Sequence, residues 1–194
     1  GDNAASALGT GVVKNGSAVS ILGTSGVVLA TSDDHVLEPS ASIQTFCHAV
    51  SRKYTLSGVT LMAGGSLSWL CDTFFSEDKQ SAAQKGLNVY HGMDNMASRI
   101  SPGCGGLMYL PYLMGERTPH HDPNARGVFF GISKTHGRPH FIRAVLEGVC
   151  FAMKDSVEII QKEIGQISDM RITGGGADSE LWVCLLYTSP SPRD

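Results

Sequence analysis

Leu22-Gly23-Thr24-Ser25-Gly26-Val27 is the stretch from which the organisation of this chain can be worked out. It lies between two runs with β-strand character, Ala18–Leu22 and Val27–Ala30, and therefore predicts a tight strand–turn–strand. The backbone N–H groups of such a turn converge on one point, which suits an anion, and the hydroxyls of Thr24 and Ser25 add donors there. Taken alone, the stretch favours an ordinary hairpin.

The composition is that of a globular protein without a strong charge. The chain has 194 residues, of which 42% are hydrophobic and 17% charged, with a net charge of -3. This charge disfavours nucleic acid and anionic membranes as partners, and no apolar run approaches the length of a membrane span. The five cysteines form no CxxC pair, which favours a reduced, cytoplasmic compartment.

Helical and strand patterns alternate along the chain and predict a mixed α/β fold. The clearest element is a helix over Pro139–Ile164 with one continuous apolar stripe, Pro139 in its first turn and Gly165 as its C-terminal cap. Two further helices are expected over Asn3–Leu8 and Met93–Ile100, and another begins at Ser179. A fourth is expected to be capped by Ser66 and to carry Leu67, Leu70, Thr73 and Phe74 on one face. The expected strands are Ala18–Leu22, Val27–Ala30, Phe46–Val50, Tyr54–Ala63, Leu107–Leu110, Val128–Phe130 and Met170–Ile172.

Three glycine-rich turns stand at the ends of predicted strands: Gly23–Gly26, Gly64-Gly65 and Gly174–Gly176. The second and third lead into helices, and such a junction lets backbone approach a ligand and points a helix N-terminus at negative charge. Three of them, with Asp2 near the start, suggest a nucleoside triphosphate site. Neither the Walker A pattern nor the dinucleotide-binding glycine pattern is complete. Asp2 by itself is more typical of a helix cap than of a catalytic base.

Other reactive side chains have plain structural interpretations. His120-His121-Asp122 is more typical of a solvated loop than of a metal site, because adjacent side chains point apart on an extended chain. Cys104, with no base near it in the sequence, is expected to be an inert thiol, and Glu147 a structural hydrogen-bond partner. Arg117 and Arg126 either reach phosphate or hold their loop in place, and the sequence leaves both open.

The last residues, Cys184–Asp194, read CLLYTSPSPRD and match a reading frame through a widely used transposon sequencing adapter. A strand–glycine–helix unit would continue past Trp182, whereas here a Ser/Pro tail is expected. We therefore exclude this tail from the fold prediction. A genuine disordered terminus is the alternative.

Several stretches resemble the FGGY family of carbohydrate kinases. They are Gly1-Asp2-Asn3-Ala4-Ala5, Leu22–Gly26, Gly115–His120, and, as in the family's C-terminal signature, Gly127–Ile132 followed by His140-Phe141 and Ala144–Glu147. The resemblance extends from Gly1 to Trp182. Within the family, Phe46–Ala49 and Gly115–Phe130 are most similar to xylulose kinases.

The resemblance implies an actin/hexokinase-like (ribonuclease H-like) α/β fold of two domains, with ATP in the cleft between them. Residues 1–12 would end the N-terminal domain, residues 13–183 would form most of the C-terminal nucleotide-binding domain, and residues 184–194 would be the adapter-derived tail. The partners implied are ATP with Mg²⁺ and a small sugar, and a homodimer is an open option.

The same resemblance implies roles for individual residues. Asp2 stands where the family has its catalytic base and would also contact the sugar. The residues implied in nucleotide binding are Gly23, Thr24, Ser25 and Gly26 at the β/γ-phosphates, Gly64 and Ser68 beside the nucleotide, and Gly174, Gly175, Gly176 and Ser179 on the adenosine side. Some relatives carry Gln in place of Ser68 and Asn in place of Ser179. No side chain is assigned to a metal.

The activity implied is ATP-dependent phosphorylation of a ketopentose, with D-xylulose converted to D-xylulose 5-phosphate. Ribulose, gluconate or glycerol are alternative acceptors, and by itself this chain would be an inactive nucleotide-binding module. A chaperone or filament ATPase of the same fold is disfavoured by the kinase-like Gly115–Phe130 loop, an argument from family analogy.

Overall fold

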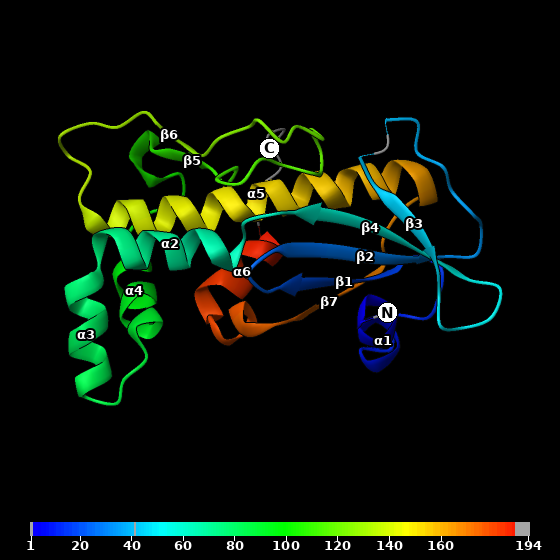
Figure 1. The fold of residues 1–194 in the computed structure, drawn as a ribbon, viewed down its shortest axis with the longest axis horizontal. Coiled ribbons are helices and arrows are strands. Elements are labelled where there is room, and N and C mark those ends of the chain that lie inside the picture. Colours follow the sequence, from blue (N-terminus) through cyan, green and yellow to red (C-terminus); the bar gives the residue numbers. More distant parts are fainter. Residues whose placement is uncertain (1, 41, 189–194) are drawn as a thin grey trace.

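A five-stranded mixed sheet forms the centre of the computed structural model, which describes residues 2–40 and 42–188 and, of Asp2, the backbone only. The strand order is β3-β4-β2-β1-β7, in which β7 runs parallel to β1 and the other neighbours pair antiparallel (Figure 1). The strands are β1 (Ser17–Leu22), β2 (Gly26–Ser32), β3 (Gln44–Cys47), β4 (Tyr54–Thr60) and β7 (Asp169–Thr173).

Both faces of this sheet are covered. Helix α5 (Arg138–Ile164) runs along one face, and helix α1 (Asp2–Gly9) lies on the other (Figure 1). The alternation of side chains along β1 and β2 produces two cores, because neighbouring residues of a strand point to opposite faces. The larger core packs against α5, and the smaller one is made of Ala7, Val12, Val19 and Leu29.

The remaining elements extend the α5 side of the molecule and its end nearest the β1–β2 turn (Figure 1). Strands β5 and β6 form a separate antiparallel pair. The elements are α2 (Gly64–Phe74), α3 (Ser76–Gln84), α4 (Val89–Ala97), the 3₁₀ turn η1 (Cys104–Gly106), β5 (Met108–Leu110), β6 (Val128–Phe130), the 3₁₀ turn η2 (Gly175–Asp178) and α6 (Glu180–Thr188). Within the described part of the chain, no helix combines the length and the apolar character that a membrane crossing requires.

The predicted hairpin, the long helix and the last strand are confirmed, with Pro139 in the first turn of α5 and Gly165 as its cap. The expected N-cap at Ser66 is wrong. Helix α2 already begins at Gly64, and the Ser66 hydroxyl donates to the Met62 carbonyl at 2.7 Å from within the first turn.

One expected strand boundary and one expected core residue also differ. Strand β3 ends at Cys47 rather than Val50, because His48 N–H donates to the Lys53 carbonyl at 2.9 Å and closes the turn to β4. Phe74 is 59% exposed, whereas its neighbour Phe75 is 2% exposed and enters the core. The apolar face predicted for α2 is therefore off by one residue at the C-terminal end of the helix.

Helix α6 includes Cys184–Thr188, where the sequence predicted that a Ser/Pro tail begins. Leu185 on this segment is buried in the main core, and Tyr187 donates its hydroxyl to the Met170 carbonyl at 3.1 Å. Residues 189–194 lie outside the described residues. The proposed domain boundaries and the origin of the tail stay predictions.

Candidate functional site

The three glycine-rich turns meet at one end of the sheet and border a single pocket of about 850 Å³. Most of the residues predicted to bind a nucleotide line it: Gly23, Thr24, Gly64, Ser68, Gly175, Gly176 and Ser179. A pocket of this size is in the usual range for small-molecule sites. The structure thus brings together turns that are separated by roughly 40 and 110 residues of sequence.

Three predicted residues do not line the pocket. Gly26 pairs with Thr60 in the sheet, and a Cβ on it would lie 2.8 Å from the Thr60 Cγ2. Gly174 packs against the backbone of Leu22, and Ser25 lies at the tip of the β1–β2 turn. Any role of these residues toward a nucleotide stays a prediction.

The β1–β2 turn is bonded directly to the start of helix α2. Gly64 N–H donates to the Gly23 carbonyl at 2.9 Å, while Ala63 N–H and Gly65 N–H both donate to the Thr24 carbonyl, at 2.8 and 2.9 Å. A helix N-terminus leaves its first N–H groups without partners inside the helix, and here the turn supplies acceptors for them. The expectation that these N–H groups point freely at a ligand is therefore wrong for α2.

The donors that remain available belong to the turn itself. Among the described residues, the backbone N–H groups of Thr24 and Ser25 have no acceptor. Successive unpaired N–H groups in a tight turn form a concave site for an anion. Thr24 also lines the pocket, so this turn presents unpaired backbone donors beside it.

Glycine is required in these turns because the turns touch one another. A Cβ on Gly64 would lie 2.6 Å from the Gly23 carbonyl oxygen, and a Cβ on Gly176 would lie 2.3 Å from Leu22 Cδ2. Gly174 has a φ of +96°, and its Cβ would lie 2.7 Å from the Leu22 carbonyl oxygen. Mutual packing of the turns, and not only close approach of a ligand, thus explains these glycines.

The opposite wall of the pocket comes from helix α4 and was not found from the sequence. Asn88 accepts a hydrogen bond from Tyr90 N–H at 3.0 Å and caps the helix, while Asp94 is hydrogen-bonded to Ser179. Burial raises the pKa of Asp94, and the Ser179 bond and His91 oppose this rise. The prediction began this helix at Met93. Asn88 itself is a cap signal that would have placed the wall correctly.

Glu116 joins the pocket to the loop that follows β5. It is 3% exposed, and its carboxylate accepts hydrogen bonds from Thr60 Oγ1, from Leu61 N–H at 3.1 Å and from Arg117 N–H at 2.7 Å. Thr60 is the last residue of strand β4 and Leu61 follows it, shortly before the Gly64 turn. The same loop carries Met114 to the wall of the pocket. Glu116 therefore connects two walls of the site.

The ionisation of Glu116 makes a testable contribution to stability. Burial raises its pKa above the ordinary value of 4.5, so the folded protein holds the proton more tightly than the unfolded chain. This contribution is complete below pH 4.5 and is lost as the pH rises through the folded-state pKa. We expect urea unfolding to show a smaller loss of stability above pH 4.5 in Glu116→Gln than in the wild type. Equal pH profiles would contradict this.

Glu147 has the structural role predicted for it. It accepts hydrogen bonds from Arg143 Nε at 2.6 Å and from Gly103 N–H at 3.1 Å. Its carboxylate also lies 3.5 Å from the Sγ of Cys104, which the sequence had left without a neighbouring base. Burial raises the pKa of Cys104 to about 12, so the thiol stays protonated and unreactive.

His120 and Arg126, in the loop after β5, contact the protein itself. The Tyr112 hydroxyl and the His120 ring nitrogen lie 3.0 Å apart, and the Arg126 guanidinium donates to the carbonyls of Pro123 and Ala125. Arg126 thus holds its loop in place. For Arg117, both predictions, contact with a phosphate and stabilisation of the loop, stay open. No group of His, Cys, Asp and Glu side chains within the described residues is arranged to hold a metal ion.

Asp2, the predicted base, is the first residue of α1. Its side chain lies outside the described residues, so its predicted role stays a prediction.

Comparison with known proteins gives consistent matches over nearly the whole chain. The model of the FGGY family of carbohydrate kinases, C-terminal domain, matches residues 18–186. A xylulose kinase of Staphylococcus epidermidis is 40% identical over 95% of this chain, and a gluconokinase of Bacillus subtilis is 34% identical over 93% of it. The crystal structure of a xyloylose kinase from Brucella ovis is 35% identical, with a TM-score of 0.84 over 96% of this chain and 36% of that one.

These matches bear on the fold and on the extent of the chain. The mixed α/β architecture is like that of the FGGY C-terminal domain, as the sequence predicted. The chain spans 35% of the length of the S. epidermidis relative. From residue 18 to residue 186, this chain belongs to the FGGY family of carbohydrate kinases and carries its C-terminal domain.

Proposed function

We propose that this chain supplies the ATP-binding part of a kinase that converts D-xylulose to D-xylulose 5-phosphate. The observation that carries the proposal is the pocket in which three turns converge beside the unpaired N–H groups of Thr24 and Ser25. Such donors suit the phosphates of ATP. The 40% identity to a xylulose kinase supports the choice of sugar.

In the proposed reaction, the chain mainly binds and orients the reactants, because phosphoryl transfer depends on positioning and charge stabilisation. The Thr24–Ser25 turn holds the terminal phosphate oxygens, and the wall with Asp94 and Ser179 receives the nucleoside. The Asp2 carboxylate accepts the proton of the sugar hydroxyl as the sugar oxygen bonds to the γ-phosphorus and the bond to the β,γ-bridging oxygen breaks, which releases ADP.

Mg²⁺ is part of the proposal. Within the described residues no group of three or more His, Cys, Asp and Glu side chains is arranged to hold it, so its protein ligands would be few and the phosphate oxygens its main contacts. When bound there, it neutralises charge on the transferred group. We also propose a cytoplasmic location, from the absence of paired cysteines.

The acceptor sugar is tested with the complete kinase that contains this chain. In an assay coupled to ADP release, D-xylulose should give a higher kcat/KM than ribulose, gluconate or glycerol. Equal or faster turnover of gluconate would favour the second candidate, which the 34% identity to a gluconokinase supports. The 194-residue chain by itself should phosphorylate none of them, and measurable phosphorylation by it would contradict that part of the proposal.

Nucleotide binding can be followed in the chain itself, because both of its tryptophans, Trp69 and Trp182, line the pocket. Addition of ATP with Mg²⁺ should change their fluorescence. Thr24→Val removes one hydroxyl donor and should weaken ATP binding about 10-fold, since a hydrogen bond to a charged group is worth ~1.5–3 kcal/mol. Adenosine should bind both proteins equally. The matched control is Thr73→Val, at an exposed position of α2. If Thr24→Val weakened adenosine binding as much as ATP binding, the phosphates would not be bound at Thr24.

A further inference from the structure

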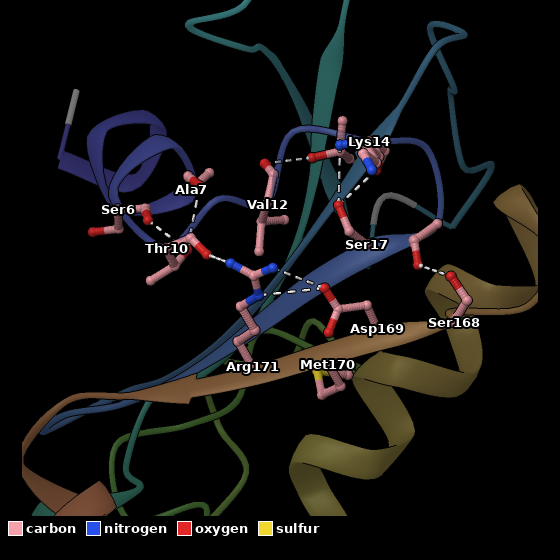
Figure 2. Close-up of polar contacts among 12 residues, drawn as sticks. Ser6, Ala7, Thr10, Val12, Lys14, Ser17, Ser168, Asp169, Met170 and Arg171 are labelled. Atoms are coloured by element: carbon pink, nitrogen blue, oxygen red, sulfur yellow. Dashed lines mark hydrogen bonds and ion pairs between the residues drawn. The ribbon is translucent and has the colours of Figure 1, made fainter.

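Arg171 on strand β7 holds the end of helix α1 (Figure 2). Its Nε and Nη2 donate to the Asp169 carboxylate at 3.3 and 3.1 Å, which fixes the plane of the guanidinium. Its Nη1 donates to the Thr10 carbonyl. Gly11 makes room for this contact, because a Cβ there would lie 2.5 Å from the Arg171 Nη1.

Thr10 is the point at which α1 ends. Its N–H and its hydroxyl both donate to the Ser6 carbonyl, at 3.0 and 2.7 Å, so the residue closes the last turn (Figure 2). The carbonyl of Thr10 therefore lies at the C-terminal end of the helix. A cation is favourable there because the last carbonyls of a helix carry partial negative charge.

A second anchor lies two residues further on, at Val12. Its carbonyl accepts a hydrogen bond from Thr31 Oγ1 at 2.9 Å and lies 3.0 Å from His48 Nε2. His48 Nδ1 accepts from Val50 N–H at 2.9 Å, so Nε2 carries the proton and donates to Val12. Ala7 of α1 is also buried against Val12, Val19 and Leu29, but apolar packing is non-directional and does not by itself fix the orientation of a short helix. The Arg171 contact to Thr10 adds a directional bond at the end of the helix.

Strand β7 connects this anchor with the pocket. Arg171 pairs with Val19 of β1, and two residues after it the strand ends and leads to Gly174, which packs on Leu22. Leu22 directly precedes the phosphate-binding turn. The strand that holds α1 is thus part of the frame that holds the turn.

We propose that Arg171 is a positioning residue that fixes the orientation of α1 relative to the Thr24–Ser25 turn. On the proposed function, on which this second step rests, it thereby holds the backbone of Asp2 in place relative to the transferred phosphate. Helix α1 has 8 residues and is therefore roughly 12 Å long. A tilt of about 10° about its C-terminal end displaces its first residue by about 2 Å. A misplacement of about 1 Å at a reacting group can cost 100-fold in rate.

The orientation of α1 is tested in the 194-residue chain by backbone hydrogen exchange. In Arg171→Ala, the amides of α1 and of residues 10–12 should exchange at least 10-fold faster than in the wild type, while Arg171→Lys, which keeps the charge but not the planar fork of donors, should lie in between. The matched control is Arg138→Ala. It breaks an ion pair to Asp78 of similar exposure together with a cation–π contact to Phe75, far along the chain from α1. Unchanged exchange in Arg171→Ala would overturn the proposal.

The effect on Asp2 is tested in the complete kinase. Arg171→Ala should lower kcat 10- to 100-fold and leave the KM for ATP within twofold, because the turn itself is not moved, and Arg171→Lys should recover much of kcat. A general loss of structure would instead raise the KM for ATP or reduce the folded fraction. Faster exchange in α1 with unchanged kcat would overturn the positioning role. A wild-type enzyme that phosphorylates no sugar would overturn the proposed function. The hydrogen-exchange result would still decide whether Arg171 anchors α1.

Discussion

Replacing Glu116 by alanine is expected to lower the free energy of unfolding by about 3–5 kcal/mol. The reason is that three donors lose their acceptor at a position that is only 3% exposed: the Thr60 hydroxyl, Leu61 N–H and Arg117 N–H. A buried donor without a partner costs ~1–3 kcal/mol, because water cannot replace the lost acceptor. Urea unfolding of the chain, followed by circular dichroism, measures this loss.

The matched variant is Glu116→Gln. Its amide oxygen can still accept from Leu61 N–H and Arg117 N–H, and its NH₂ group can donate to the Thr60 hydroxyl. We expect it to lose less than about 1.5 kcal/mol, since shape and hydrogen bonds are largely kept. Equal stability of the alanine variant and the wild type would show that the Glu116 bonds do not hold the end of β4 to the loop that follows β5.

Replacing Gly64 by alanine is expected to weaken ATP binding at least 10-fold. The new Cβ would lie 2.6 Å from the Gly23 carbonyl oxygen, a backbone atom that cannot turn aside. The start of α2 must then move away from the β1–β2 turn, and the bonds from Ala63 and Gly65 to Thr24 are stretched. The Thr24 and Ser25 N–H groups lose their orientation as a result. A titration with ATP and Mg²⁺, read by tryptophan fluorescence, measures the affinity.

The control for this variant is Gly92→Ala. Gly92 lies in helix α4, next to pocket residues, and a Cβ on it would meet no atom within 4 Å. Alanine in a helix is more favourable than glycine by roughly 1 kcal/mol, so this variant should be at least as stable as the wild type and bind ATP equally well. Full ATP affinity in Gly64→Ala would show that the contact between the two turns is not needed for binding.

Several parts of the fold were predictable because their signals are local. The Leu22–Gly26 turn combines glycines with flanking β-type runs, and α5 repeats apolar residues at helical spacing over its whole length. Helix α3 was missed because it buries none of its residues and so shows no apolar stripe. Helix α4 begins at Val89, four residues before the predicted Met93, because Asn88 caps it.

The candidate site was predictable as a set of turns but not as a set of contacts. The glycines at 23, 64, 175 and 176 were found from their positions at strand ends, and all line the pocket. The bonds of Glu116 to Thr60 join residues 56 positions apart, and no spacing rule predicts such a pair. The contact of Arg171 with Thr10, across 161 positions, is of the same kind.

The sequence by itself determined the α/β class, the hairpin turn, the long helix and the membership in the FGGY family, because each depends on residues close together along the chain. Only the tertiary structure decided that α2 gives its first N–H groups to the Gly23 and Thr24 carbonyls, which leaves the donors of the turn itself for a ligand. It also decided that Asp94 faces Ser179 and that Arg171 holds α1. These pairings depend on how the sheet stacks distant segments, and local composition does not encode that stacking.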